Sequence, residues 1–179
     1  IIFATLSPDY AFPGSGVLLQ EKLGLVQGDS KKFVPALDVR NQCSGFLYSL
    51  STATSMVEAG RYKHILVVGA EVHSAALDLS TRGRTVACLF GDGAGAVVVS
   101  ATQDPGRGMR TWNLGADGRY ADILCQKVWD MSRRPFVQTD DEGNAMIPAD
   151  ELYAYMDGST VFRHAITRMT QSLKQSLEA

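Results

Sequence analysis

The sequence has few cysteines and no closely spaced cysteine pair. Its three cysteines, Cys43, Cys88 and Cys125, are far apart, and no two form a C-x-x-C motif. A zinc site needs closely spaced ligands, and a disulfide framework needs an even number of cysteines. The sequence therefore predicts free thiols, no metal site and the reducing environment of the cytoplasm.

Long apolar runs and a strong charge of either sign are also missing. No stretch reaches the roughly 18 apolar residues of a membrane-spanning helix, and no basic segment precedes an apolar one as in a signal peptide. The formal net charge is −2. This balance argues against a broad contact with nucleic acid or an anionic membrane. With 45% hydrophobic and 20% charged residues, the composition is typical of a soluble globular protein.

Both ends of the sequence lack the features of a natural terminus. Residues 1–5 have the pattern of a core strand and contain no Met, and the last residues continue in helical register up to Ala179. A helix commonly closes with a capping residue such as Gly. We therefore expect the sequence to be a segment of a longer protein.

Apolar runs and helical periodicities alternate along the chain. Strands are expected at residues 1–5, 34–39, 65–70, 85–90, 94–99 and 109–114, and helices at 17–25, 44–59 and 159–177. Residues 27–32 are expected to form an exposed loop, and residues 115–150 to be irregular. The alternation predicts an α/β fold with a mainly parallel sheet.

Local signals mark where some of these elements end. Gly60 is expected to end the second helix, and Asp157 or Ser159 to cap the last one. The second helix has Glu58 as its only charge and is expected to be buried on most sides. The glycines of Gly91-Asp92-Gly93 are expected to form a hairpin or sharp bend, with Gly93 at positive φ.

Cys43 lies where the strand expected at 34–39 meets the helix expected at 44–59. At a helix N-terminus, free backbone N–H groups and the helix dipole favour a thiolate. The same N–H groups can hold an oxyanion. This pattern indicates a nucleophile elbow with cysteine in place of serine. The alternative is that Cys43 is a small buried hydrophobe, as most free cysteines are.

Other motifs also have structural alternatives. Residues 91–95 lack the spacing and the following helix of a dinucleotide-binding fingerprint. The histidines show no metal-ligand spacing, and His73 is the best candidate for a residue near Cys43. Arg82-Gly83-Arg84 would contact an anionic ligand or form a solvated turn. Phe12, in a loop, would serve a pocket or a partner, or anchor the loop on its own core.

Eight short stretches share their order with one known family. They are Ile2–Thr5, Ala11–Pro13, Cys43–Phe46, Ala59–Tyr62, Leu66–Glu71, Leu89–Val97, Gly115–Gly118 and Met156–Gly158. In order and in much of their spacing they resemble the β-ketoacyl-acyl-carrier-protein synthase III family of the thiolase superfamily. The resemblance spans nearly the whole chain.

The resemblance implies a thiolase-like αβαβα sandwich, of which this chain would hold only the central part. Residues 1–100 would form most of the N-terminal half, with the nucleophile elbow. Residues 101–179 would form a connecting segment, a pocket-lining insertion and the first helix of the C-terminal half.

The resemblance also implies a reaction. Cys43 would attack an acyl-coenzyme A thioester and carry the acyl group, and its own backbone N–H would form half of an oxyanion hole. Malonyl-acyl-carrier protein would then decarboxylate and attack the acyl-enzyme in a Claisen condensation that starts fatty-acid synthesis. This order predicts ping-pong kinetics. No cofactor is implied, since acyl-coenzyme A is a substrate.

Six substrate-binding residues follow from the same resemblance. Phe12 would reach across a homodimer into the neighbouring acyl pocket, and Arg82 or Arg84 would contact coenzyme A. The acyl pocket would be lined by Phe90, Met156 and Phe162. The implied partners are acyl-coenzyme A, acyl-carrier protein and a second copy of the chain, with no nucleic acid and no membrane.

The chain departs from the family pattern in what it lacks. The family completes its site with a histidine, an asparagine and a second oxyanion donor from a C-terminal half that does not appear in this chain. His73 stands where the family usually has an apolar pocket residue and is no substitute for the missing base. The segment alone is therefore expected to be inactive. Two alternatives remain: a condensing enzyme or acyltransferase of secondary metabolism, and a non-catalytic partner subunit of the same fold.

Overall fold

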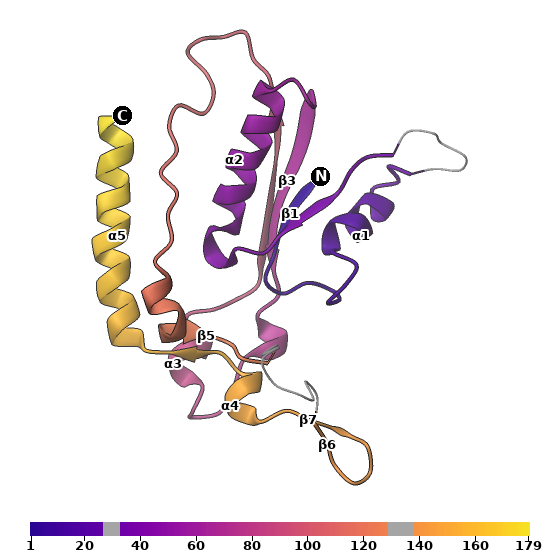
Figure 1. The fold of residues 1–179 in the computed structure, drawn as a ribbon, viewed down its shortest axis with the longest axis vertical. Coiled ribbons are helices and arrows are strands. Elements are labelled where there is room, and N and C mark those ends of the chain that lie inside the picture. Colours follow the sequence, from indigo (N-terminus) through magenta and orange to yellow (C-terminus); the bar gives the residue numbers. More distant parts are fainter. Residues whose placement is uncertain (27–32, 129–137) are drawn as a thin grey trace. The chain divides into compact units, whose positions relative to one another are not determined.

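The computed structural model describes residues 1–26, 33–128 and 138–179 (Figure 1). It divides into two compact units, each built from segments that are distant in the sequence. The first unit comprises Ile1–Val72 and Asp92–Trp112, and the second comprises His73–Gly91 and Asn113–Ala179. The loop expected at 27–32 lies outside the described residues. The boundary expected at residue 100 stays a prediction.

A four-stranded sheet forms the first unit, in the order β2-β1-β3-β4. The strands β1 (Ile2–Ala4), β2 (Leu37–Val39) and β3 (His64–Glu71) are parallel, and β4 (Gly93–Ser100) pairs antiparallel with the whole of β3. The mainly parallel sheet is therefore confirmed, together with the strands expected at 1–5, 65–70 and 94–99.

The strand β2 is shorter than expected and is not buried. Among the described strands it lies at an edge of the sheet and pairs with β1, and the side chain of Leu37 is 44% exposed. The apolar residues at 34–39 therefore predict a strand correctly but not its burial, because burial depends on which other elements pack against the strand.

Two helices belong to the same unit. The helix expected at 17–25 is α1 (Ser15–Lys22), and the one expected at 44–59 is α2 (Gly45–Glu58). Figure 1 shows α2 running along the sheet. The core joins α2 to the strands, with Ile2, Ala53, Val57, Ile65 and Val67 buried together.

Two threonines of α2 are satisfied within the helix, whereas the buried hydroxyl of Ser49 has no hydrogen-bond partner among the described residues. The hydroxyl of Thr52 donates to the carbonyl of Tyr48, and that of Thr54 to the carbonyl of Leu50, both at 2.9 Å. Burial on most sides is confirmed in part, because Leu47 is 53% exposed. A helix with one charge can lie against the sheet in this way because its polar side chains need little water.

Gly60 ends α2 with φ at +70°. Its N–H donates to the carbonyl of Val57, and the N–H of Arg61 donates to the carbonyl of Met56, both at 3.0 Å. These two bonds form a Schellman motif, which satisfies carbonyls of the last helical turn. The prediction that Gly60 ends the helix is confirmed.

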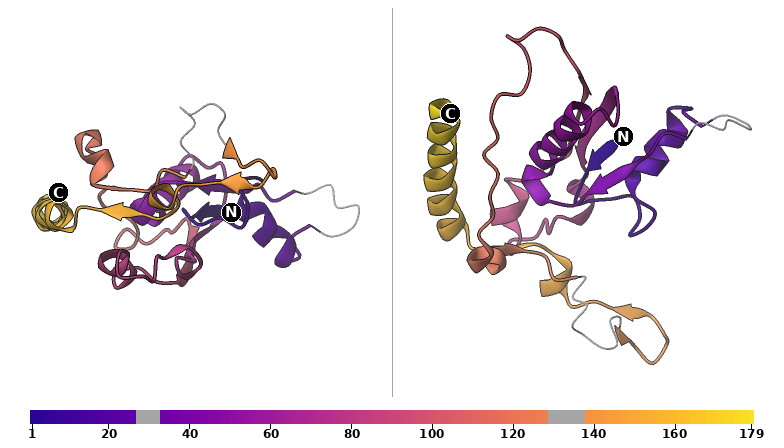
Figure 2. Two further views of the ribbon diagram at one scale, coloured as in Figure 1. Left: turned by 90° about the horizontal axis from the view of Figure 1, so that it is seen from below. Right: turned by 45° about the horizontal axis from the view of Figure 1, so that its top comes forward.

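The second unit contains one long helix and several short elements. The long helix, α5 (Gly158–Glu178), confirms the helix expected at 159–177, and Figure 2 shows it end-on in its left view. The short elements are η2 (Ser74–Ala76), α3 (Arg84–Ala87), η3 (Gly118–Ile123), α4 (Ala149–Leu152), and the paired strands β5 (Leu124–Cys125) with β8 (Tyr155–Met156) and β6 (Gln138–Thr139) with β7 (Ala145–Met146). None of the helices in the described ranges is both long and apolar enough to cross a membrane.

Several side chains fasten α5 within its unit. Asp157 caps the helix by accepting a hydrogen bond from the N–H of Thr160 at 3.1 Å, so Asp157 is the cap among the two residues expected. The amide of Asn113 donates to the carbonyl of Ser172 at 3.2 Å and to Gln175 at 2.6 Å. The segment before η3 is thereby held to the last turns of α5.

Two expected strands are wrong. Residues 85–90 begin with α3, where the N–H groups of Val86 and Ala87 both donate to the carbonyl of Gly83 at 2.9 Å. A short apolar run does not by itself distinguish a strand from a helix. Residues 109–114 pair with no strand in the described parts of the chain.

A hairpin that joins strands at 85–90 and 94–99 is therefore wrong as well, because residues 85–90 form no strand. The alternative, a sharp bend at 91–93, stays a prediction. Gly93 is not among the glycines at positive φ, and a Cβ placed there would meet no atom within 4 Å. The backbone conformation and the surroundings at residue 93 therefore do not require a glycine.

These two glycines make a matched pair for a stability measurement on the full-length protein. Gly60→Ala should lower the free energy of unfolding by about 1 kcal/mol, because a left-handed backbone is unfavourable for any residue with a Cβ. Gly93→Ala should change it by less than about 0.5 kcal/mol. Urea denaturation measures both, and an equal loss in the two variants would contradict the assignment of φ.

Candidate active site

Cys43 lies in a short 3-10 helix, η1 (Gln42–Ser44), between β2 and α2. Its side chain is exposed. The preceding residue, Gln42, has φ at +44°, and it is the one non-glycine residue at positive φ in the described ranges. Such a conformation costs on the order of 1–2 kcal/mol, and strained residues of this kind cluster at functional sites. The strand-turn-helix geometry of a nucleophile elbow is therefore present around Cys43.

The N-terminus of α2 carries no side-chain cap. No acidic residue lies in its first turn, and its N-cap residue, Ser44, makes no side-chain cap hydrogen bond. The hydroxyl of Ser44 instead donates back to the carbonyl of Asn41 at 3.3 Å. The positive end of the helix dipole is thus not offset by a carboxylate of the helix itself, which suits a developing negative charge.

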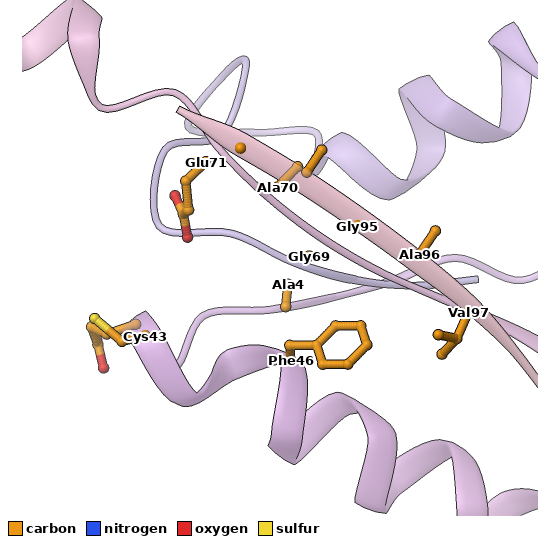
Figure 3. Close-up of a pocket in the computed structure, with 12 residues that line it drawn as sticks. Ala4, Cys43, Phe46, Gly69, Ala70, Glu71, Gly95, Ala96 and Val97 are labelled. Atoms are coloured by element: carbon orange, nitrogen blue, oxygen red, sulfur yellow. The ribbon is translucent and has the colours of Figure 1, made fainter. Parts of the chain in front are cut away.

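A pocket of about 510 Å³ opens beside Cys43. It is lined by Ala4, Gln42, Cys43, Phe46, Gly69, Ala70, Glu71, Gly93, Ala94, Gly95, Ala96 and Val97. Figure 3 shows Cys43 at one end and Val97 toward the other, with Phe46 between them. Glycine and alanine make up most of the wall, so an apolar group has room next to the thiol.

Glu71 is the charged residue among the side chains that line this pocket. Its carboxylate accepts hydrogen bonds from the N–H groups of Leu6 at 3.0 Å and Ser7 at 3.2 Å, and from the hydroxyl of Ser7 at 2.6 Å. The hydroxyl of Thr5 adds a contact at 3.3 Å. The sequence marks Glu71 only as the end of an apolar strand, and the groups that it binds lie 64–66 residues away.

The second unit contains five of the six predicted binding residues, namely Arg82, Arg84, Phe90, Met156 and Phe162. None of them lines the pocket beside Cys43, and their place relative to it stays a prediction. Phe90 contacts the ring of His73 edge-to-face, with ring centroids 5.3 Å apart. Phe162 is 66% exposed on α5, and Met156 is half-buried in β8.

The histidines have local partners. The Nδ1 atom of His73 lies 2.9 Å from the carbonyl oxygen of Gly91, and that of His64 lies 2.8 Å from the hydroxyl of Ser100. The ring of His164 lies against Tyr120, with centroids 4.0 Å apart. Among the described residues, no group of three His, Cys, Asp or Glu side chains could hold a metal ion.

The two arginines around the start of α3, Arg82 and Arg84, differ in their availability to a ligand. The Nε of Arg82 donates to the carboxylate of Asp78 at 2.6 Å, and its guanidinium lies 5.4 Å from the ring centroid of Tyr153. Hydrogen bonds from Ser80 and Arg82 lower the pKa of Asp78 to about 2, so this carboxylate stays charged at neutral pH. Arg84 is exposed and pairs with no residue in the described ranges, which leaves it open to an anion.

Phe12 is 85% exposed in the loop between β1 and α1. It therefore does not anchor that loop on the core of its own unit. Its predicted role across a homodimer stays a prediction.

The comparisons with known proteins agree with one another. A family profile described as 3-oxoacyl-[acyl-carrier-protein (ACP)] synthase III matches residues 37–118, a range that includes Cys43. The solved structure of β-ketoacyl-[acyl-carrier-protein] synthase III from Thermus thermophilus is 36% identical to this chain, with a TM-score of 0.72, and the match covers 93% of this chain and 45% of that one.

Two further solved structures extend this likeness. The 3-oxoacyl-(acyl carrier protein) synthase III from Pseudomonas aeruginosa PAO1 is 30% identical, with a TM-score of 0.76, over 99% of this chain and 48% of that one. The priming β-ketosynthase from the R1128 polyketide biosynthetic pathway is 27% identical, with a TM-score of 0.69, over 96% and 45%. The chain thus spans less than half the length of these relatives.

The expected α/β fold of thiolase type is confirmed by these structures, at roughly half of its full extent. The elbow around Cys43 lies within the matched residues. The chain is thus similar in sequence and in fold to the 3-oxoacyl-[acyl-carrier-protein] synthase III family of thiolase-like condensing enzymes.

Proposed function

We propose that this chain is the part of a condensing enzyme that carries the nucleophile, and that Cys43 takes an acyl group from acyl-coenzyme A. The observation that carries the proposal is the exposed thiol of Cys43 on a strained turn, beside an apolar pocket and the uncapped start of α2. A thiol in such a place can be reached by a bound thioester, and reactive cysteines lie in accessible positions of this kind.

The loading step follows from this geometry. The Cys43 thiolate attacks the carbonyl carbon of the thioester, and the carbonyl oxygen becomes an oxyanion held by the backbone N–H of Cys43. The C–S bond to coenzyme A then breaks, and coenzyme A leaves as a thiolate that takes a proton from solvent. The acyl group remains on Cys43 as a new thioester.

The condensation step follows by family resemblance. Malonyl-acyl-carrier protein loses CO₂, and its carbanion attacks the acyl carbon on Cys43, which releases the thiolate and forms a 3-oxoacyl product. The histidine and asparagine that favour decarboxylation belong to the C-terminal half of the family fold. This segment alone is therefore expected not to complete the reaction.

The remaining binding residues differ in how far their surroundings support the proposed roles. Arg84 suits a coenzyme A phosphate better than Arg82, because Arg82 is paired with Asp78. The exposure of Phe12 suits a contact across a homodimer. The roles of Phe90, Met156 and Phe162 in the acyl pocket rest on the resemblance alone.

A second candidate function is a condensing enzyme of secondary metabolism. The 27% identity to the priming β-ketosynthase of the R1128 polyketide pathway favours it. The two functions differ in the acceptor, so a comparison of malonyl-acyl-carrier protein with other acceptors distinguishes them. A non-catalytic partner subunit has less support, since it need not keep a cysteine at the elbow.

The first experiment loads the full-length protein with acetyl-coenzyme A and maps the adduct by mass spectrometry. The acetyl group should appear on the peptide that holds Cys43, and Cys43→Ala should abolish it without changing the circular dichroism spectrum. Cys125→Ala serves as the matched control and should load at the parent rate. Normal loading of Cys43→Ala would refute the mechanism, and the absence of any adduct with short and long acyl donors would favour the partner subunit.

The two arginines provide a second test, through the Michaelis constant for acetyl-coenzyme A. Arg84→Ala should raise KM about tenfold, because a charge-assisted hydrogen bond to phosphate is lost. Arg82→Ala should change KM less, since Arg82 already pairs with Asp78. Steady-state loading assays measure both variants, and the opposite order would assign the contact to Arg82.

A further inference from the structure

We infer that Glu71 is a positioning residue, whose carboxylate holds the turn after β1 in place and thereby fixes the pocket end beside Cys43. The effect on acyl loading rests on the proposed function. The arrangement itself rests on contacts between described residues of the first unit, and Figure 3 shows Glu71 near the same end of the pocket as Cys43.

The carboxylate gathers four donors from three consecutive residues. Its Oε1 atom accepts from the N–H of Leu6 at 3.0 Å. Its Oε2 atom accepts from the N–H and the hydroxyl of Ser7, at 3.2 and 2.6 Å, and from the hydroxyl of Thr5 at 3.3 Å. An ionised carboxylate is suited to this cluster because it offers acceptors only.

Ser7 closes the link in the other direction. Its hydroxyl donates to Glu71 and accepts a hydrogen bond from the N–H of Val72 at 2.9 Å. The Ser7 hydroxyl thus connects the turn after β1 to the end of β3 through two hydrogen bonds, one that it donates and one that it accepts. Neither half of this link belongs to the regular hydrogen bonding of the sheet.

The segment after β1 also contacts the residues around the elbow. The N–H of Thr5 donates to the carbonyl of Val39 at 3.3 Å, four residues before Cys43. On the other side of Cys43, a Cβ added at Gly45 would lie 3.2 Å from the Cβ of Ala4. The end of β2 before the elbow thus bonds to Thr5, which Glu71 holds, and the start of α2 after the elbow lies close to Ala4, the residue next to Thr5.

Two substitutions of Glu71 separate its hydrogen-bond acceptors from its shape, and this separation allows a test. Glu71→Gln keeps the shape of the side chain but replaces one acceptor oxygen by an NH₂ donor that would face other donors. Glu71→Asp shortens the side chain by one methylene but keeps both acceptor oxygens. A clamp that depends on acceptors should tolerate Asp better than Gln, whereas a residue that only fills space should tolerate Gln better.

The experiment uses the full-length protein with Glu71→Gln, Glu71→Asp and a matched control, Glu58→Gln, at the exposed end of α2. Single-turnover acetyl loading of Cys43 is measured against acetyl-coenzyme A concentration, with hydrogen exchange of the Leu6 and Ser7 amides and thermal unfolding alongside. We expect Glu71→Gln to lower the maximal loading rate roughly ten- to a hundredfold, as small displacements at a reacting atom do. The concentration for half-maximal rate should change less than about twofold, and the two amides should exchange faster.

The inference is overturned if Glu71→Gln loads within about twofold of the parent protein, or if it loads faster than Glu71→Asp. Should Glu71→Gln fail to fold, Ser7→Ala replaces it, and unchanged loading together with unchanged amide exchange in that variant overturns the inference equally. If the parent protein itself takes no acetyl group, the proposed function fails, and the rate of Cys43 alkylation by iodoacetamide then decides. Equal alkylation rates in the parent and Glu71→Gln would reject the positioning role, and a slower or faster rate in the variant would support it.

Discussion

The close approach of the start of α2 to the sheet is the constraint on which the candidate site depends. At Gly45 an added Cβ would lie 3.2 Å from Ala4, and at Gly69 it would lie 3.2 Å from the ring of Phe46. Larger residues at these positions would force the helix start and the strands apart. Because Cys43 lies two residues before this helix begins, the spacing between helix and sheet sets the position of the thiol and the width of the pocket beside it.

Much of this architecture could be predicted from local patterns. Continuous apolar runs gave the correct positions of β1, β3 and β4, and helical periodicity those of α2 and α5. The ends marked by Gly60 and Asp157 were also predictable, because a left-handed C-cap and an Asx N-cap depend on a few adjacent residues. The elbow around Cys43 belongs to the same class, since it requires only a strand, a turn and a helix in succession.

The parts that could not be predicted depend on partners distant in the sequence. The run at 85–90 satisfies both strand and helix patterns, and only the carbonyl of Gly83 and the burial of Val86 decide between them. The segment at 34–39 is apolar enough for an inner strand, yet β2 lies at an edge. The role of Glu71 depends on donors from the other end of the unit, which no local pattern reveals.

Two residues at positive φ, one on each side of α2, fix which residues the helix contains. The helix lies between two residues at positive φ, Gln42 on one side and Gly60 on the other. A slide of the helix by one residue would move the left-handed end from Gly60 onto Ala59 or Arg61, at a cost of about 1–2 kcal/mol. The two positive-φ residues thus fix the register of α2 at both ends. The position of the Cys43 sulfur relative to the sheet follows from this register and does not require a contact made by the sulfur itself.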